Sequence, residues 1–180
     1  MGSISTRMTE RFGCRHPFAA AGMAFAGSTA DLALGVCAGG GIGAIGVGFT
    51  PAEQLRAVIH QIRAATGAPF NINFITCFEN DPQIRVCAEE KVPVASFHWG
   101  HPSPEHLRLL RDAGVSAWEQ VGGVEAAKPA VGLEECGADR LQLGLVDRRI
   151  ISEEFGATAP LGREGMLAGE LAKPRQCRLR

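Results

Sequence analysis

The feature that most constrains this chain is an alternation of short apolar segments with capped amphipathic helices, which runs from Pro17 to about Leu145. Such an alternation predicts βα units and a parallel sheet. We count five complete units and a candidate sixth strand at 141–143. A (β/α)₈ barrel has eight units and typically ~250 residues, and this chain has 180. The sequence therefore predicts an α/β fold, a partial TIM-type barrel of five to six βα units with parallel strands, followed by an irregular tail.

Local signals place the individual elements. Thr50-Pro51-Ala52-Glu53 predicts a helix start with Thr50 as N-cap and Glu53 completing a capping box. Ser103, which is followed by Pro104, predicts another helix start. A six-strand doubly wound domain is the alternative fold, with helices on both faces of the sheet. The expected strands are 16–23, 42–47, 70–75, 92–97 and 115–120.

The segment 41–46 matches the glycine pattern GxGxxG of dinucleotide-binding folds. That fingerprint must follow a strand and open a helix. Here the glycines follow a predicted helix and lie inside the expected strand, and the next helix starts only near Thr50. We therefore interpret them as small residues that let this strand pack closely, and not as a nucleotide site.

Composition and charge exclude several classes of function. The net charge of −1 gives no reason to expect binding to nucleic acid or to an anionic membrane. No stretch of ~18 apolar residues suggests a membrane span, and the first residues lack the apolar core of a signal peptide. The six cysteines show no CxxC spacing and no zinc pattern. We expect a cytoplasmic protein without a metal site.

Two histidines follow the expected fourth strand, in the segment Phe97-His98-Trp99-Gly100-His101. Loops after the strands of a barrel are where catalytic groups collect. His98 is the candidate catalytic residue in the pocket wall, whereas we expect His101 to be a solvated residue of the loop that enters the next helix. No carboxylate or cysteine stands next to the pair in sequence, which argues against a metal.

Several segments together resemble the nitronate monooxygenase (2-nitropropane dioxygenase) family, an FMN-dependent barrel family. The resemblance covers roughly residues 6–133. The matching segments are His16-Pro17-Phe18 to Ala21-Gly22-Met23, Ala38-Gly39-Gly40-Gly41-Ile42-Gly43, Pro69-Phe70-Asn71-Ile72-Asn73, Val94-Ala95-Ser96-Phe97-His98-Trp99-Gly100 and Ala113-Gly114-Val115. The resemblance implies FMN as cofactor and the oxidation of alkyl nitronates by molecular oxygen to a carbonyl compound and nitrite. It divides the chain into an incomplete FMN-type barrel domain, 1–145, and a weakly structured tail, 146–180.

The resemblance also implies which residues meet the cofactor. The backbone at Ala21, Gly22 and Met23 would face the isoalloxazine ring, and Gly22 would allow a close approach because it lacks a Cβ. Asn73 and Gln120, at the ends of expected strands, would offer polar contacts that tune the flavin. Each also has a structural interpretation: Asn73 as a partner for strand-end backbone groups, Gln120 as a solvated strand end, and Met23 as core.

The chain departs from the family after the fifth unit. The family's catalytic histidine lies in a Gly-Gly-His-like run after strand six, and this chain has no histidine after His106. The usual phosphate anchor comes from loops after strands seven and eight, for which we find no candidates. We therefore expect impaired activity, from truncation or a shifted reading frame. The alternatives are another FMN-dependent barrel oxidoreductase, enoyl reductase-like or inosinate-dehydrogenase-like, and a non-catalytic half-barrel that self-associates through exposed sheet edges.

Overall fold

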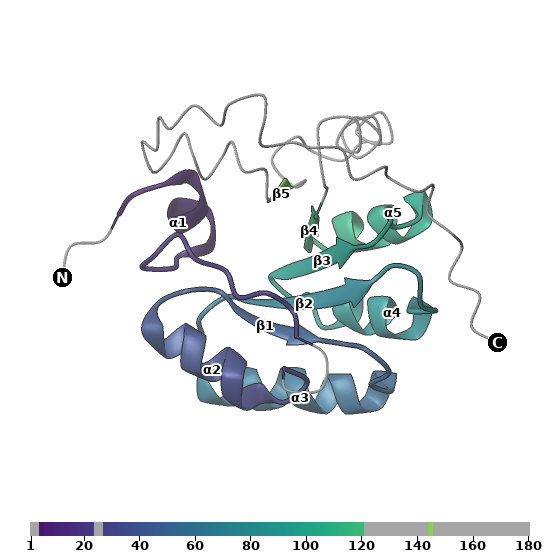
Figure 1. Ribbon diagram of the computed structural model, residues 1–180, viewed down its shortest axis with the longest axis horizontal. Coiled ribbons are helices and arrows are strands. Elements are labelled where there is room, and N and C mark those ends of the chain that lie inside the picture. The colour runs from purple at the N-terminus through teal and green to yellow at the C-terminus, as the bar shows by residue number, and fades with distance from the viewer. Residues whose placement is uncertain (1–3, 24–26, 121–143, 146–180) are drawn as a thin grey trace, which may run out of the picture.

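A computed structural model of the chain describes residues 4–23, 27–120 and 144–145. In this part of the chain, five parallel strands form one sheet in the order β1-β2-β3-β4-β5 (Figure 1). The strands are β1 (Gly43–Gly46), β2 (Phe70–Ile75), β3 (Val94–His98), β4 (Ser116–Glu119) and β5 (Gly144–Leu145). The helices are α1 (Arg7–Phe12), α2 (Ala30–Gly39), α3 (Ala52–Ala65), α4 (Asp81–Glu89) and α5 (Pro104–Asp112).

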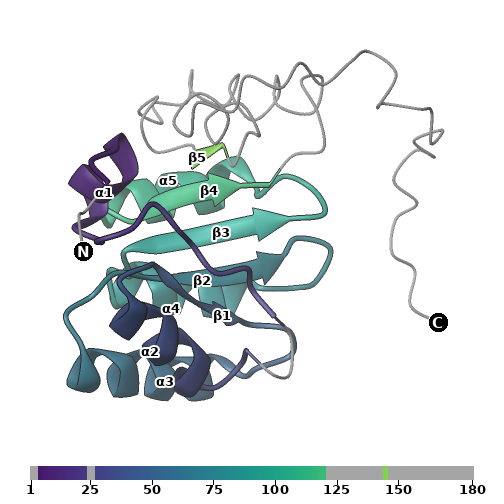
Figure 2. The same cartoon turned by 60° about the vertical axis from the view of Figure 1, so that its left-hand side comes forward.

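The strand order follows the order along the chain without a reversal. Each strand pairs in parallel with the next one, and a helix follows β1, β2 and β3 before the next strand begins. A doubly wound sheet would reverse its order at a switch point, so that alternative is wrong. Figure 2 shows the strands stacked in sequence, as in one arc of a barrel wall. The predicted α/β fold of TIM-barrel type is therefore confirmed, for part of a barrel.

The expected first strand, 16–23, forms only one bridge to the sheet. Ala19 pairs in parallel with Ile42, through hydrogen bonds from Ala20 N to Ile42 O (2.9 Å) and from Ile42 N to Phe18 O (2.8 Å). Pro17 has no N–H to contribute. Among residues 21–23, no backbone bond to β1 is found, and Gly27 accepts from the N–H of Gly46. The segment keeps its expected place beside the second expected strand, but it is not an extended strand.

The start of α3 differs from the capping box expected at Thr50. The N-cap is Pro51, which has no side-chain bond to the helix. The backbone of Thr50 instead belongs to the turn that ends β1, donating from its N–H to Val47 O (2.8 Å) and accepting from Gln83 Nε2 (2.9 Å). The Ser103 cap is confirmed: its side chain accepts from the N–H of His106 at 3.1 Å.

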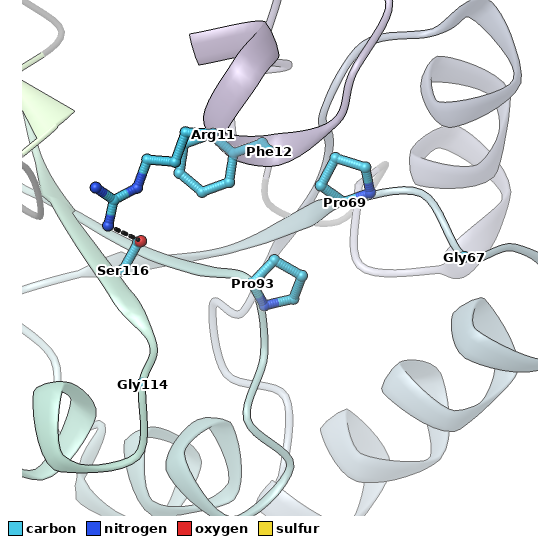
Figure 3. A pocket seen from close by; sticks show the side chains of 7 residues that line it. All are labelled: Arg11, Phe12, Gly67, Pro69, Pro93, Gly114 and Ser116. Atoms are coloured by element: carbon cyan, nitrogen blue, oxygen red, sulfur yellow. Dashed lines mark hydrogen bonds between the residues drawn. The ribbon is translucent and has the colours of Figure 1, made fainter. Parts of the chain in front are cut away.

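One face of the sheet carries α1 near the start of the strands. Phe12 meets Trp118 edge to face, with ring centroids 5.3 Å apart, and Arg11 donates to the hydroxyl of Ser116 at 3.2 Å. A depression of about 460 Å³ lies between α1 and the segments that lead into β2, β3 and β4 (Figure 3). We call this face the inner face, because in a barrel it would point toward the axis.

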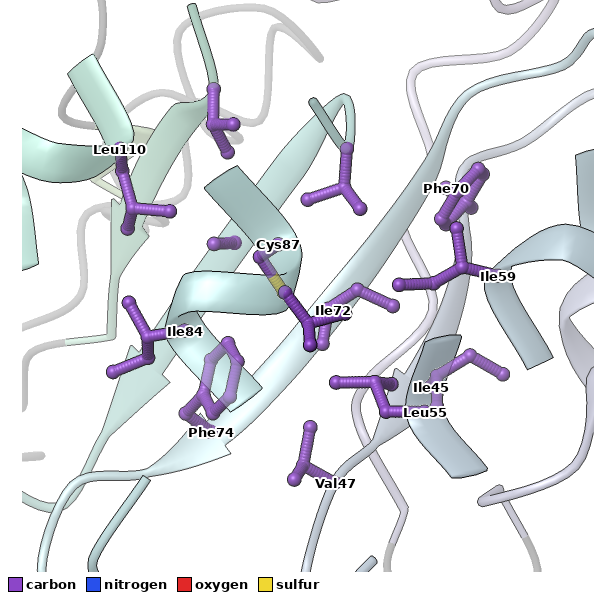
Figure 4. Close-up of a cluster of buried hydrophobic side chains, with 14 of the residues drawn as sticks. Ile45, Val47, Leu55, Ile59, Phe70, Ile72, Phe74, Ile84, Cys87 and Leu110 are labelled. Atoms are coloured by element: carbon purple, nitrogen blue, oxygen red, sulfur yellow. The ribbon is translucent and has the colours of Figure 1, made fainter. Parts of the chain in front are cut away.

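The other face carries α2 to α5 and the larger hydrophobic core. Strand residues alternate between the two faces, so Ile45, Ile72 and Phe74 point toward the helices (Figure 4). Phe97 lies on the same face as its register partner Phe74, and all four side chains are buried. Phe74 and Phe97 stack with ring centroids 5.3 Å apart. This core fixes the pleat of the sheet and thereby decides which polar side chains appear on the inner face.

The glycines of the segment 41–46 act as the sequence interpretation expected. A Cβ on Gly43 would lie 2.4 Å from the carbonyl oxygen of Ala33 in α2, and one on Gly46 would lie 2.6 Å from that of Met23. The first glycine lets α2 pack on the strand, and the second lets the segment ending at Met23 cross its other face. The close packing of β1 therefore accounts for the GxGxxG pattern, and no helix begins within this segment.

Candidate functional site

The inner face carries a row of polar side chains toward the carboxyl ends of β2 and β3. The register aligns Gly46, Asn73, Ser96 and Trp118 across four neighbouring strands. Asn71 lies two residues before Asn73 on the same face. Such polar residues on central strands are unusual because both sides of a parallel sheet are normally apolar, so this row is the candidate site.

Three of these side chains form one hydrogen-bonded cluster. Ser96 Oγ accepts from Asn71 Nδ2 and from Asn73 Nδ2, each at 2.8 Å. Asn71 is 4% exposed and Ser96 is 9% exposed. The carbonyl oxygen of Asn71, Oδ1, is buried and finds no partner within the described residues. A buried acceptor of this kind calls for a hydrogen-bond donor from elsewhere.

The segment 21–23 lies against this cluster. A Cβ on Gly22 would stand 2.2 Å from Cβ and Oδ1 of Asn73, so only glycine lets the backbone cross at this point. Ala21 is exposed and Met23 is 42% exposed. The structure thus brings Gly22 and Asn73, two of the residues expected to meet a cofactor, into direct contact. The side chain of Asn73 occupies the space that a Cβ on Gly22 would need.

His98 ends β3, with Ile75 as its partner in β2. It is half-buried, and its ring meets that of Trp99 edge to face at 5.2 Å. Loss of solvent by burial lowers the pKa of His98, although a hydrogen bond with the backbone of Phe74 acts in the opposite direction. The imidazole is therefore neutral near pH 7 and is able to accept a proton.

Gln120 directly follows β4 and is exposed. Its N–H donates to the carbonyl of Phe97 at 2.9 Å, which continues the ladder beside β3. No hydrogen bond joins its side chain to Asn73 or His98 within the described residues. Gln120 thus lies at the same edge of the sheet as His98, and its expected role stays a prediction.

Two functional candidates escaped the sequence interpretation. Ser96 lies in one of the segments that resemble the family, but the sequence analysis gave it no role. The feature that could have indicated it is a polar residue inside an apolar strand. Glu119 is 2% exposed, and its carboxylate contacts Nδ1 of His101. Burial raises the pKa of Glu119, against the opposing effect of His101. His101, expected as a solvated loop residue, is 40% exposed and is held by this contact.

The donor set fits a flavin ring better than a metal ion. Within residues 4–23, 27–120 and 144–145, no three His, Cys, Asp or Glu side chains gather in a way that could bind a metal. The cluster instead offers carboxamides and a hydroxyl on rigid strands, with an orphaned buried acceptor at Asn71. Neutral donors and acceptors of this kind suit a planar heterocycle with N–H and C=O groups. No helix in the described part of the chain is long and apolar enough to cross a bilayer.

Comparison with solved structures agrees with this architecture. The structure of FabK from Thermotoga maritima superposes with a TM-score of 0.68 and 35% identity, over 76% of this chain and 43% of that one. The sheet winding and this likeness define the class as (β/α) barrel proteins, of which the described residues form a part.

The family resemblance rests on the N-terminal part of the chain. The nitronate monooxygenase family model matches residues 5–82. A nitronate monooxygenase from Paraburkholderia phytofirmans is 30% identical, over 65% of this chain and 43% of its own length. A (3aS,4S,5R,7aS)-5-hydroxy-7a-methyl-1-oxo-octahydro-1H-indene-4-carboxyl-CoA dehydrogenase from Rhodococcus jostii is also 30% identical, over 77% of this chain and 38% of its own. The chain thus spans less than half of the length of these curated relatives, and the match to the nitronate monooxygenase family model is confined to residues 5–82.

Three predicted segments lie outside the described residues. They are the helix expected at about 124–136, the candidate sixth strand at 141–143 and the expected tail, 146–180. β5 begins directly after that candidate strand and pairs in parallel with β4 through Trp118–Gly144 and Glu119–Leu145.

Proposed function

We propose that this chain supplies the ring-facing part of an FMN site in an oxidoreductase of the nitronate monooxygenase type. The observation that carries the proposal is the cluster of Asn71, Asn73 and Ser96 on the inner face, with the backbone at Gly22 packed directly on Asn73. Gly22, Asn71 and Asn73 all lie within the residues that match the family model. The substrates would be alkyl nitronates and molecular oxygen, and the products a carbonyl compound and nitrite.

In this proposal the chain's own residues orient the reactants. Asn73, within β2, and Gln120, directly after β4, offer polar contacts, and the backbone at Ala21, Gly22 and Met23 lines the ring. His98 acts as the catalytic group, because its burial keeps the imidazole neutral and ready to accept a proton or a hydrogen bond near pH 7. Bound FMN would supply the redox chemistry between the nitronate and oxygen, and the residues named above would hold its ring.

We further propose that the 180-residue chain by itself turns over slowly. Its sequence has no histidine after His106 to take the place of the family's catalytic residue. The usual phosphate anchor of a barrel comes from later βα loops, for which the sequence offered no candidate. Ring contacts without a strong phosphate contact predict measurable but weak FMN binding.

The test is FMN binding and oxygen uptake by the purified full chain. Flavin fluorescence titration should give a saturable curve, and Asn73→Ala should raise the dissociation constant about tenfold, a loss of ~1.4 kcal/mol. Gln61→Ala, on the exposed side of α3, is the matched control and should leave it unchanged. A wild-type chain that is folded by circular dichroism yet binds no FMN would refute the proposal, and a monodisperse dimer without flavin would favour the self-associating half-barrel.

A second candidate is an FMN-dependent barrel oxidoreductase of the enoyl reductase type. It is favoured by the relative from Rhodococcus jostii, whose name describes a CoA-ester dehydrogenase at the same 30% identity as the nitronate monooxygenase. Anaerobic mixing of the FMN-loaded chain with either a nicotinamide or a nitronate separates the two. Bleaching of the flavin by the nicotinamide alone would favour the second candidate.

A further inference from the structure

The hydroxyl of Ser96 has a hydrogen-bonding capacity that the cluster uses only in part. A serine hydroxyl has two acceptor positions and one donor. The amide groups of Asn71 and Asn73 both donate to Ser96 Oγ at 2.8 Å, and this fills the two acceptor positions. The hydroxyl hydrogen is left to donate elsewhere, and within the described residues no acceptor for it is found among the side-chain hydrogen bonds.

The same two bonds fix the orientation of both carboxamides. Because each Nδ2 faces Ser96, each carbonyl oxygen must face away from it. Oδ1 of Asn73 is thereby brought to the side where Gly22 packs, and Oδ1 of Asn71 is left buried without a donor. The inner face thus holds, side by side, a buried acceptor and an unused hydroxyl donor.

We propose that Ser96 is a positioning residue, which orients Asn71 and Asn73 so that the inner face is complementary to the amide edge of a flavin ring. This rests on the proposed function. The pyrimidine part of isoalloxazine carries an N–H beside C=O groups, so its N–H would satisfy an acceptor such as Asn71 Oδ1. One of its carbonyls would accept from Ser96. A phosphate, which offers only acceptors at neutral pH, would leave the Asn71 oxygen unpaired.

Position on the sheet makes Ser96 suited to this role. Asn73 and Ser96 are register partners on the paired strands β2 and β3, and Asn71 lies on the same face of β2. Buried strands hold side chains more rigidly than loops do. The hydroxyl therefore keeps both carboxamides in place before any ligand arrives, which lowers the cost of binding.

The experiment compares three variants of the full chain. Ser96→Ala removes the hydroxyl, and Ser96→Thr keeps it. Ser116→Ala is the matched control, because Ser116 is also buried, lies on the same face and bonds to Arg11 instead of the cluster. Two readouts are followed: the side-chain amide signals of Asn71 and Asn73 in ¹⁵N-resolved NMR of the FMN-free chain, and the dissociation constants of FMN and riboflavin.

Ser96→Ala should shift both asparagine side-chain signals in the FMN-free chain. It should also weaken FMN and riboflavin about tenfold alike, because the contact is with the ring. Ser96→Thr should stay within about twofold of wild type, as should Ser116→Ala. The amide signals test the positioning role even if the wild-type chain binds no FMN, an outcome that refutes the proposed function and the ligand part of this inference together.

Three results would overturn the inference while leaving the proposed function intact. The first is unchanged FMN affinity in Ser96→Ala. The second is a loss of affinity that Ser96→Thr does not restore. The third is a loss confined to FMN and not seen with riboflavin, which would place the affected contact at the phosphate end.

Discussion

Replacement of Gly43 by alanine probes the close packing of β1 against the backbone of α2. The added Cβ would lie 2.4 Å from the carbonyl oxygen and 2.8 Å from the Cα of Ala33. Both atoms belong to the backbone of α2, and Ala33 is fully buried. Because an ordinary contact needs at least 3.4 Å, the helix and the strand would have to separate by about 1 Å.

The cost of this separation can be estimated from known overpacking. Extra methyl groups in a packed core cost ~1–3 kcal/mol, and a rigid backbone neighbour argues for the upper end. For a domain of this size each kcal/mol moves the midpoint by ~2–4 °C, so we expect Gly43→Ala to lower Tm by about 6–12 °C. Thermal and urea unfolding followed by circular dichroism measure both quantities.

Gly35→Ala is the matched control, since Gly35 lies in the same helix, α2, and nothing stands within 4 Å of its added Cβ. Alanine favours a helix over glycine by ~0.5–1 kcal/mol, so this variant should be slightly more stable than wild type. Equal midpoints for Gly43→Ala and wild type would contradict the reasoning. A loss in Gly35→Ala as large as that in Gly43→Ala would do so as well, because it would show a general effect of the substitution.

Three further predictions concern titratable groups. Burial lowers the pKa of His98, so its contribution to stability is fully present above its unfolded pKa of ~6.5 and is lost as pH falls below that value. His98→Gln should therefore make the urea midpoint depend less on pH below about 6.5. A pH dependence equal to that of wild type would contradict this prediction. Burial raises the pKa of Glu119, so ionisation of this carboxyl lowers the free energy of unfolding as pH rises above ~4.3. The difference in unfolding free energy between Glu119→Gln and wild type should therefore shift in favour of Glu119→Gln between about pH 4 and neutrality. A difference that stays constant over this range would show that the pKa of Glu119 is not raised. Burial also raises the pKa of the Cys87 thiol, whereas Cys77 is exposed; alkylation of the native chain, mapped by mass spectrometry, should modify Cys77 well before Cys87, and equal rates would refute this placement.

Much of the fold was predictable from short-range signals. The apolar segments at 42–47, 70–75, 92–97 and 115–120 correspond to β1 to β4, and the helices between them follow from amphipathic periodicity. The expected strand at 16–23 is reduced to the Ala19–Ile42 bridge. Strand formation depends on a partner for each backbone group, and sequence patterns do not report that partner.

The start of the chain illustrates a different limit. The sequence analysis named no element before residue 16, and α1 begins at Arg7, with a capping box between Thr6 and Thr9. The usual capping box has Glu or Gln at the fourth position, so this signal was weak. What holds α1 in place is tertiary, namely the packing of Phe12 against Trp118.

The candidate site was predictable only in part. Asn73 and Gly22 were both indicated by the family resemblance. Ser96 escaped because its importance lies in its register with Asn73 across two strands. The contact of His101 with Glu119 escaped for the same reason: the two residues are 18 positions apart and meet only where β4 lies beside the loop after β3.

The amino-acid sequence by itself determined the alternation of strands and helices and the apolar faces that pack together, because these depend on neighbours three or four residues away. The tertiary structure alone decided which polar side chains share a face. Parallel pairing brings together residues such as Asn73 and Ser96, 23 positions apart, at 2.8 Å. The reason is that strand register is set by the packing of the whole sheet against its helices, and a shift of one residue would turn this cluster to the opposite face.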